Sequence, residues 1–127
     1  MATTLEKLRG LVESLCTRTQ TGTLTWIEAE GGGIYVQIGS ALIILNDEPG
    51  SNFENDIRVS IYSDGNKIDS FTDTIFSGHS PTLTSASSYY QLLSDTLSMG
   101  RRQASGAEMV LDQLLKDLEA SPAKDFF

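Results

Sequence analysis

Few residues in this 127-residue sequence are of types that act as nucleophiles or general bases. There is one histidine, His79, and one cysteine, Cys16. A Ser-His-Asp arrangement needs a serine and an acid held against the imidazole, and Ser77 and Ser80 flank His79 only in sequence. Cys16 falls on the apolar side of a predicted helix, whereas a reactive thiolate needs an accessible, electropositive setting. Neither residue is therefore favoured as a nucleophile.

Carboxylates are the other residues that could do chemistry. Asp69 and Asp73 lie four apart on a predicted strand, which places them on one face but about 13 Å apart. Segment 47–56 is acidic but lacks the Asp-x-Asp-x-Asp-Gly order of a calcium loop. The glycine run 31–33 lies between two predicted strands, so it fits a hairpin connector better than a phosphate loop. We expect no metal, no cofactor and no enzymatic activity. A small enzyme that uses His79 with one of the two aspartates is the minor alternative.

The charge of the chain restricts its partners. Nine basic against seventeen acidic residues give a net charge of −8 and a pI near 4.4. Nucleic-acid binding depends on clustered lysines and arginines, so we expect no nucleic-acid partner. The chain starts without a signal-peptide pattern, and no apolar run approaches the roughly 20 residues that span a bilayer. We therefore expect a cytoplasmic protein that does not bind membranes.

The clearest structural signal is a hairpin over residues 57–71. Apolar and polar residues alternate from Ile57 to Ile61, which is typical of a strand with one buried face. The Asp-Gly pair at 64–65 suits the positive φ angles of a two-residue turn, and this turn would place Ile68 opposite Ile61.

Other segments supply helices and further strands. Apolar residues recur at helical spacing in 3–16, 85–102 and 105–118, and three more strands are predicted at 24–29, 34–38 and 41–45. Capping boxes at Thr3-x-x-Glu6 and Ser105-x-x-Glu108 mark the starts of the first and last helices. Gly10 costs the first helix about 1 kcal/mol relative to alanine, which suggests a close packing contact there.

The order of elements defines the expected fold. Contiguous strands joined by short turns imply an antiparallel meander of four or five strands in an α+β domain. We expect an N-terminal helix before this sheet, two C-terminal helices packed on one face of it, and a buried Trp26. Residues 1–122 would form this single domain, with 123–127 as a short tail.

Three segments together have a distinctive layout. They are the Thr25-Trp26 strand after the first helix, the hairpin from Arg58 to Gly65, and the stretch from Arg101 to Gly106 before a Leu-rich helix. This layout resembles that of small uncharacterised bacterial α+β proteins. The resemblance implies the same helix, meander and helix-pair order, and it assigns no catalytic or binding residues.

These observations favour a non-enzymatic, acidic interaction domain that binds and regulates or neutralises another protein, as antitoxins, immunity proteins and chaperones do. A basic partner would suit the charge, and a homodimer is a further option. Candidate contact residues come from the acidic loop predicted at 46–55, one tyrosine and the C-terminal aromatics: Asp47, Glu48, Phe53, Glu54, Tyr90, Phe126 and Phe127. The alternative is a small-molecule or nucleotide-binding sensor with a pocket between sheet and helices, near Trp26, Tyr35 or segment 72–84.

Overall fold

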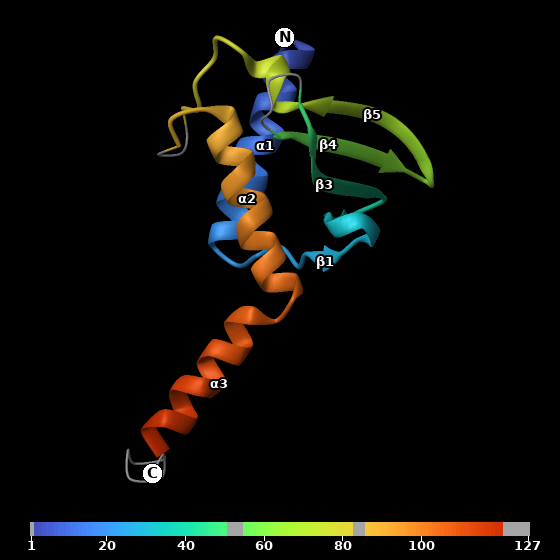
Figure 1. The fold of residues 1–127 in the computed structure, drawn as a ribbon. Coiled ribbons are helices and arrows are strands. Elements are labelled where there is room, and N and C mark those ends of the chain that lie inside the picture. Colours follow the sequence, from blue (N-terminus) through green and yellow to red (C-terminus); the bar gives the residue numbers. More distant parts are fainter. Residues whose placement is uncertain (1, 51–54, 83–85, 121–127) are drawn as a thin grey trace.

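A computed structural model describes residues 2–50, 55–82 and 86–120 of the chain. The helices are α1 (Thr4–Gln20), α2 (Tyr89–Ala104) and α3 (Ala107–Ala120), with short 3-10 turns η1 (Glu30–Gly32) and η2 (Asp73–Phe76). The strands are β1 (Ile27–Glu28), β2 (Ile34–Ile38), β3 (Ala41–Pro49), β4 (Asn55–Ser63) and β5 (Asn66–Thr72). They form one antiparallel sheet in the order β1-β2-β3-β4-β5. The predicted α+β class and meander are confirmed (Figure 1).

The β4–β5 hairpin forms around the predicted turn, with φ angles of 52° at Asp64 and 83° at Gly65. Its register differs from the prediction beyond the turn. Tyr62 pairs with Lys67, but Ile61 pairs with Asp69 because the register shifts between these two pairs. Ile68 therefore lies in a bulge, 62% exposed, and not opposite Ile61.

The sheet extends through residues predicted to form a loop. β3 continues to Pro49 and β4 begins at Asn55, so the prediction of an irregular segment over 46–55 is wrong at both ends. Two consecutive acidic residues indicated a loop, but side chains alternate along a strand, so Asp47 and Glu48 point to opposite faces of β3. Each forms an ion pair with an arginine on its face, which allows both to lie within the strand. The predicted strand 24–29 is conversely reduced to the two residues of β1.

Helices α1 and α2 lie side by side and cover one face of the sheet (Figure 1). The Thr3–Glu6 capping box of α1 forms as predicted. Trp26 is buried, as predicted, and so is Cys16. Glu13 of α1 is buried as well, and its carboxylate accepts a hydrogen bond from the Thr82 backbone N–H at 2.7 Å.

Glycine allows α2 to approach the sheet closely. A Cβ built on Gly100 would lie 2.2 Å from Ile34 Cδ1 and 3.2 Å from Trp26 Cγ, so a side chain there would overlap the core. Gly10 in α1 has no atom within 4 Å of the equivalent position. The close contact that the sequence suggests at Gly10 is therefore absent there, and Gly100 is the glycine that fills this role.

The last helix departs from the prediction. Whereas α2 packs on the sheet, α3 projects away from it (Figure 1), and none of its residues, all of which lie in the described range, is buried. The Ser105–Glu108 capping box does not form, because Ser105 ends α2 and its hydroxyl donates to the Arg102 carbonyl. Gly106, with φ of 76°, then turns the chain out of the body.

The two glycines give a matched stability test. Gly100→Ala should destabilise the fold by about 1–3 kcal/mol, because overpacking against Trp26 exceeds the gain in helix propensity. Gly10→Ala should stabilise it by about 0.5–1 kcal/mol, since the site is open. Urea denaturation of both variants measures the two effects. Equal stabilisation by both would contradict the packing of α2 described above.

Candidate interaction surface

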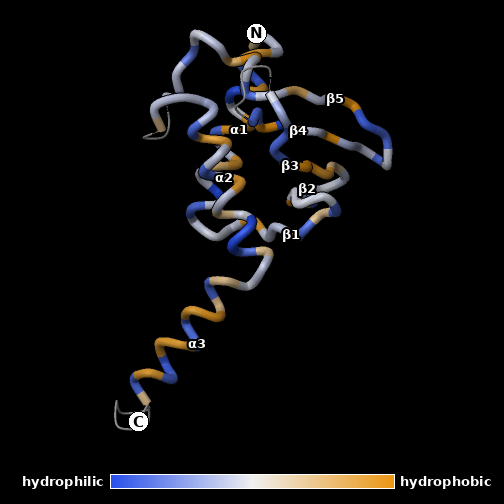
Figure 2. Tube along the Cα trace, viewed as in Figure 1, coloured by the Kyte–Doolittle hydropathy of each residue, from blue (hydrophilic) through white to orange (hydrophobic). Residues whose placement is uncertain are grey.

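An uncovered stripe of apolar side chains runs along α3. The stripe consists of Ala107, Val110, Leu111, Leu114, Leu115 and Leu118, which we call the α3 stripe. Its five larger side chains are 44–59% exposed. The spacing of three and four residues brings them to one side of the helix, as the alternating bands of hydropathy along α3 indicate (Figure 2). No residue within 2–50, 55–82 and 86–120 buries this stripe.

The body of the protein fixes the point from which α3 departs. Near the end of α2, Gln103 accepts from the Trp26 backbone N–H at 2.9 Å and donates to the Leu24 carbonyl at 2.7 Å. Arg101 donates to the Gly32 carbonyl at 2.9 Å and pairs with Asp47 at 2.9 Å. These contacts hold the C-terminal turn of α2 against the segment before β1, against η1 and against β3, so that α3 starts from an anchored end.

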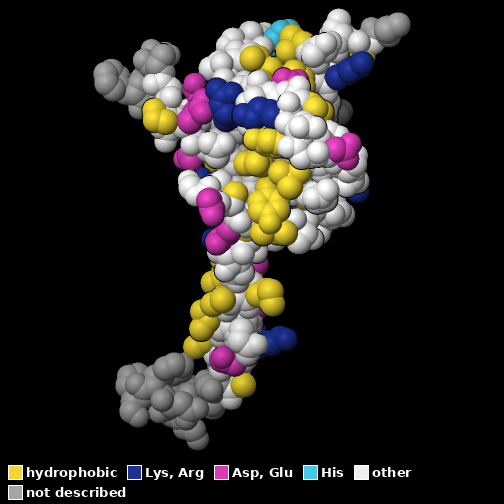
Figure 3. Space-filling view, turned by 90° about the vertical axis from the view of Figure 1, so that its right-hand side faces the viewer, with side chains coloured by type: hydrophobic (Ala, Val, Ile, Leu, Met, Phe, Trp, Pro, Cys, Tyr) yellow, Lys and Arg dark blue, Asp and Glu magenta, His cyan; other side chains and the backbone are white. Residues whose placement is uncertain are grey.

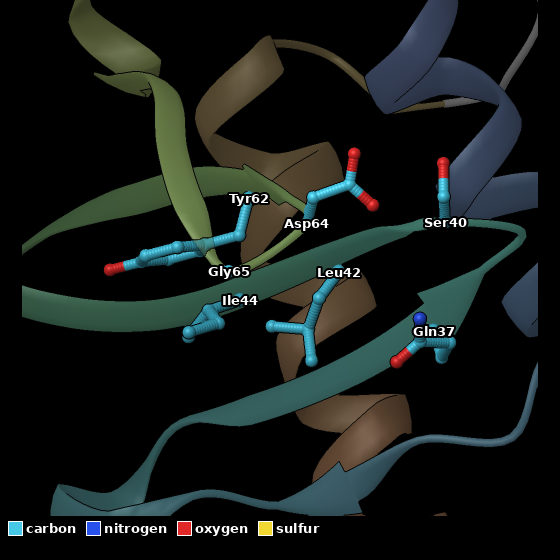
Figure 4. Close-up of a pocket in the computed structure, with 7 residues that line it drawn as sticks. All are labelled: Gln37, Ser40, Leu42, Ile44, Tyr62, Asp64 and Gly65. Atoms are coloured by element: carbon cyan, nitrogen blue, oxygen red, sulfur yellow. The ribbon is translucent and has the colours of Figure 1, made fainter.

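The face of the sheet opposite the helices carries a second apolar group. Leu42, Ile44 and Tyr62 project from β3 and β4 into a shallow hollow of about 420 Å³ (Figure 4). Gln37, Ser40, Asp64 and Gly65 complete its lining. The space-filling view shows hydrophobic side chains gathered over the body, and further ones along the helix that projects below it (Figure 3). The hollow is open, in contrast to the filled interface between sheet and helices.

The structure describes three of the seven predicted contact residues and brings two of them into internal ion pairs. Asp47 pairs with Arg101 at 2.9 Å on the helix side of β3, and Glu48 pairs with Arg58 at 2.8 Å on the open side. The Arg58 guanidinium lowers the pKa of the Glu48 carboxyl. Tyr90 is 41% exposed in the first turn of α2, away from both pairs. Phe53, Glu54, Phe126 and Phe127, and the predicted tail 123–127, lie outside the described residues.

The structure places the candidate catalytic residues at a small hollow, on strand β5 and in the core. His79 and Asp73 both line a small hollow of about 190 Å³, and the Asp73 carboxylate accepts from the Ile57 backbone N–H at 2.8 Å. Asp69 accepts from the next backbone N–H, that of Ser70. Burial raises the pKa of the Cys16 thiol, so it is a packing residue and not a thiolate nucleophile. The hydrogen bonds of Asp69 and Asp73 hold the local backbone, and the buried Cys16 belongs to the core.

Other classes of site have little support. Within the described ranges, no three His, Cys, Asp or Glu side chains gather closely enough to bind a metal ion. No helix in the described part of the chain is both long enough and apolar enough to cross a membrane. Comparisons with protein-family models, with curated proteins and with solved structures find no match to the chain.

Sequence reasoning missed both exposed apolar surfaces. The α3 stripe was visible as a periodic pattern, but the same pattern is typical of a helix packed on a core. The outward-facing Leu42 and Ile44 belong to the apolar run 41–45, where no alternation with polar residues indicates which side chains leave the core. The available signal for the α3 stripe was Gly106, because a glycine after α2 permits the left-handed turn that sends the next helix outward.

The environment of Asp73 predicts a pH effect on stability. Burial, and then the nearby charge of Asp56, raise the pKa of the Asp73 carboxyl, against the Ile57 hydrogen bond that lowers it. The folded state therefore holds the proton more tightly than the unfolded state. The contribution of Asp73 to stability falls as the pH rises from the pKa of the unfolded chain through the higher pKa of the folded protein. Asp73→Asn keeps an acceptor for Ile57 and removes the charge.

We expect Asp73→Asn to equal the wild type in stability at acidic pH and to exceed it modestly at neutral pH. Asp73→Ala is the control, since loss of the acceptor for Ile57 should cost about 1–3 kcal/mol. Urea titrations between acidic and neutral pH measure both. If the stability of the wild type increased relative to that of Asp73→Asn as the pH rises, the stated direction of the Asp73 pKa shift would be contradicted.

Proposed function

We propose that this chain is a non-enzymatic interaction domain that binds another protein through α3 and thereby regulates or neutralises it. The observation that carries the proposal is the α3 stripe, about three turns of apolar side chains that nothing in the described part of the chain covers. Contiguous exposed apolar surface of this kind marks interaction sites in soluble proteins. An amphipathic helix that lays its apolar side into a partner is a recurrent mode of recognition.

The energetics of α3 support the same proposal. An isolated helix of fewer than about 15 residues is marginal in water, because nucleation is costly and most helix stability in proteins comes from packing. α3 has 14 residues and no buried side chain of its own. A partner that buries the stripe supplies the missing stabilisation, at about 1.5–3 kcal/mol for each leucine that becomes fully buried.

The body of the domain would serve as the scaffold for α3. The Arg102 guanidinium pairs with Glu108 at 2.6 Å across the turn between α2 and α3. This exposed pair contributes little free energy, but together with Gly106 it orients the first turn of α3. A regulatory domain of this design presents one helix and keeps its own core closed.

A small-molecule sensor is the second candidate function, and one observation favours it. The open hollow over Leu42, Ile44 and Tyr62 has the size of a small-ligand site, at about 420 Å³. Its lining has few convergent polar groups, which makes it a weaker candidate than α3. Leu42→Ala should abolish binding of any ligand found by ligand-observed NMR, and should leave capture of a protein partner through α3 unchanged.

The main proposal is tested by affinity capture from the native host, followed by titration of the purified partner. We expect the double variant Leu114→Gln/Leu118→Gln to bind at least about 10-fold more weakly, since two apolar side chains are lost from the contact. Glutamine is a good helix former, so α3 itself should persist.

Met109→Gln is the matched control. Met109 is also apolar and 77% exposed, but it lies on the side of α3 opposite the stripe, so this variant should bind like the wild type. The thermal unfolding of the body should be the same in all three proteins. Equal partner binding by the wild type and the double-leucine variant would exclude α3 as the docking element.

A further inference from the structure

The charges that border the α3 stripe define the chemistry of its partner. We infer that α3 docks on a surface of another protein whose apolar residues are bordered by lysines and arginines, and not on a second copy of this chain. The inference rests on the proposed function and specifies the partner class for the same helix. It follows from where the carboxylates of α3 lie around the helix axis.

The stripe covers about 140° of the helix circumference, at 100° per residue. Glu108, Glu119 and Asp112 follow along one border, and Asp117 lies on the other. The one basic residue of α3, Lys116, is on the side opposite the stripe. Both borders are therefore acidic, and the positive charge is placed where a partner on the stripe does not meet it.

Internal contacts leave most of this border charge uncompensated. In the described part of the chain, α3 takes part in one ion pair, between Glu108 and Arg102. Asp117 accepts a hydrogen bond from Gln113 at 3.0 Å, but the amide donor carries no charge. The carboxylates at 112, 117 and 119 thus remain available to cations on a partner.

A second copy of this chain does not complement these borders. Two α3 helices packed stripe to stripe place carboxylates against carboxylates in both parallel and antiparallel alignments. The sheet hollow of another copy has Asp64 in its lining, and the Lys67 ammonium lies over the ring of Tyr62 at one side of it, 5.8 Å from the ring centroid. Arg58, on the same face of β4, is already paired with Glu48, so this hollow offers one cation beside one carboxylate and not a basic border on both sides. The net charge of −8 on each chain adds a general repulsion.

A partner with lysines and arginines beside its apolar residues matches both the apolar side chains of the stripe and the acidic residues at its borders. Apolar contact supplies affinity, and opposite charges at the rim speed the encounter and select the correct partner. Rim charges are screened by salt, whereas apolar contact is not weakened in the same way. Charge selectivity should therefore disappear at high salt while binding through the leucines persists.

The test uses the full chain and two synthetic amphipathic peptides with the same leucine stripe, one bordered by lysines and the other by glutamates. Fluorescence anisotropy measures their affinities at low and high salt. We expect the lysine-bordered peptide to bind at least about 10-fold more tightly at low salt, and the two to converge at high salt. The variant Leu114→Gln/Leu118→Gln should bind neither peptide.

Two charge variants separate the effect of the border carboxylates of α3 on binding from the effect of the net charge of the protein. The first, Asp112→Asn/Asp117→Asn/Glu119→Gln, neutralises the borders and should lose most of the preference for lysine. The second, Glu28→Gln/Glu30→Gln/Asp64→Asn, removes the same charge from exposed positions on the body and should keep that preference. Equal loss in both variants would show that only net charge acts, which would overturn the inference.

The remaining outcomes distinguish a failure of the charge inference from a failure of the proposed function on which it rests. Equal, leucine-dependent binding of both peptides would contradict the charge inference and leave the proposed function standing. Binding that ignores Leu114 and Leu118 would contradict the proposed function itself. A dimer in sedimentation equilibrium that the double-leucine variant dissociates would identify a second copy as the occupant and overturn the inference.

Discussion

The contact between Trp26 and Gly100 determines the geometry of the rest of the molecule. The indole, together with Ile34, packs so closely on Gly100 that a Cβ there would lie 3.2 Å from Trp26 Cγ and 2.2 Å from Ile34 Cδ1. This close approach seats α2 on β1 and β2. Gln103, one turn further along, bonds the backbone on both sides of Trp26. The end of α2 is thereby fixed, and with it the site from which α3 leaves.

The body and α3 differ in whether their apolar side chains are buried within the chain. In the body, α1, α2 and one face of the sheet bury each other in a continuous core. α3 has the same amphipathic character but no such surface, because Gly106 directs it away from the core. The α3 stripe thus leaves a second apolar surface in contact with water, and this is the surface that we propose a partner protein covers.

Local sequence signals predict much of the fold, whereas the features that depend on long-range contacts could not be predicted from them. The 57–71 hairpin follows from alternation and an Asp-Gly turn, but the bulge that exposes Ile68 depends on pairing beyond the turn. Asp47 looked like a free contact residue because its partner, Arg101, is 54 positions away and meets it only in the folded chain. The stripe of α3 has the same pattern as a core helix, so periodicity alone could not predict that it stays uncovered.

Hydrogen exchange of the full chain, resolved by segment, tests most directly the claim that the apolar side of α3 packs against nothing in the described part of its own chain. If α3 is unsupported, its amides should exchange far faster than those of α2 and at rates typical of local fraying, because a 14-residue helix is marginal alone. α2 should exchange only through global unfolding. Protection of α3 equal to that of α2, in a monomer, would show that the helix is docked on its own body and would contradict the account.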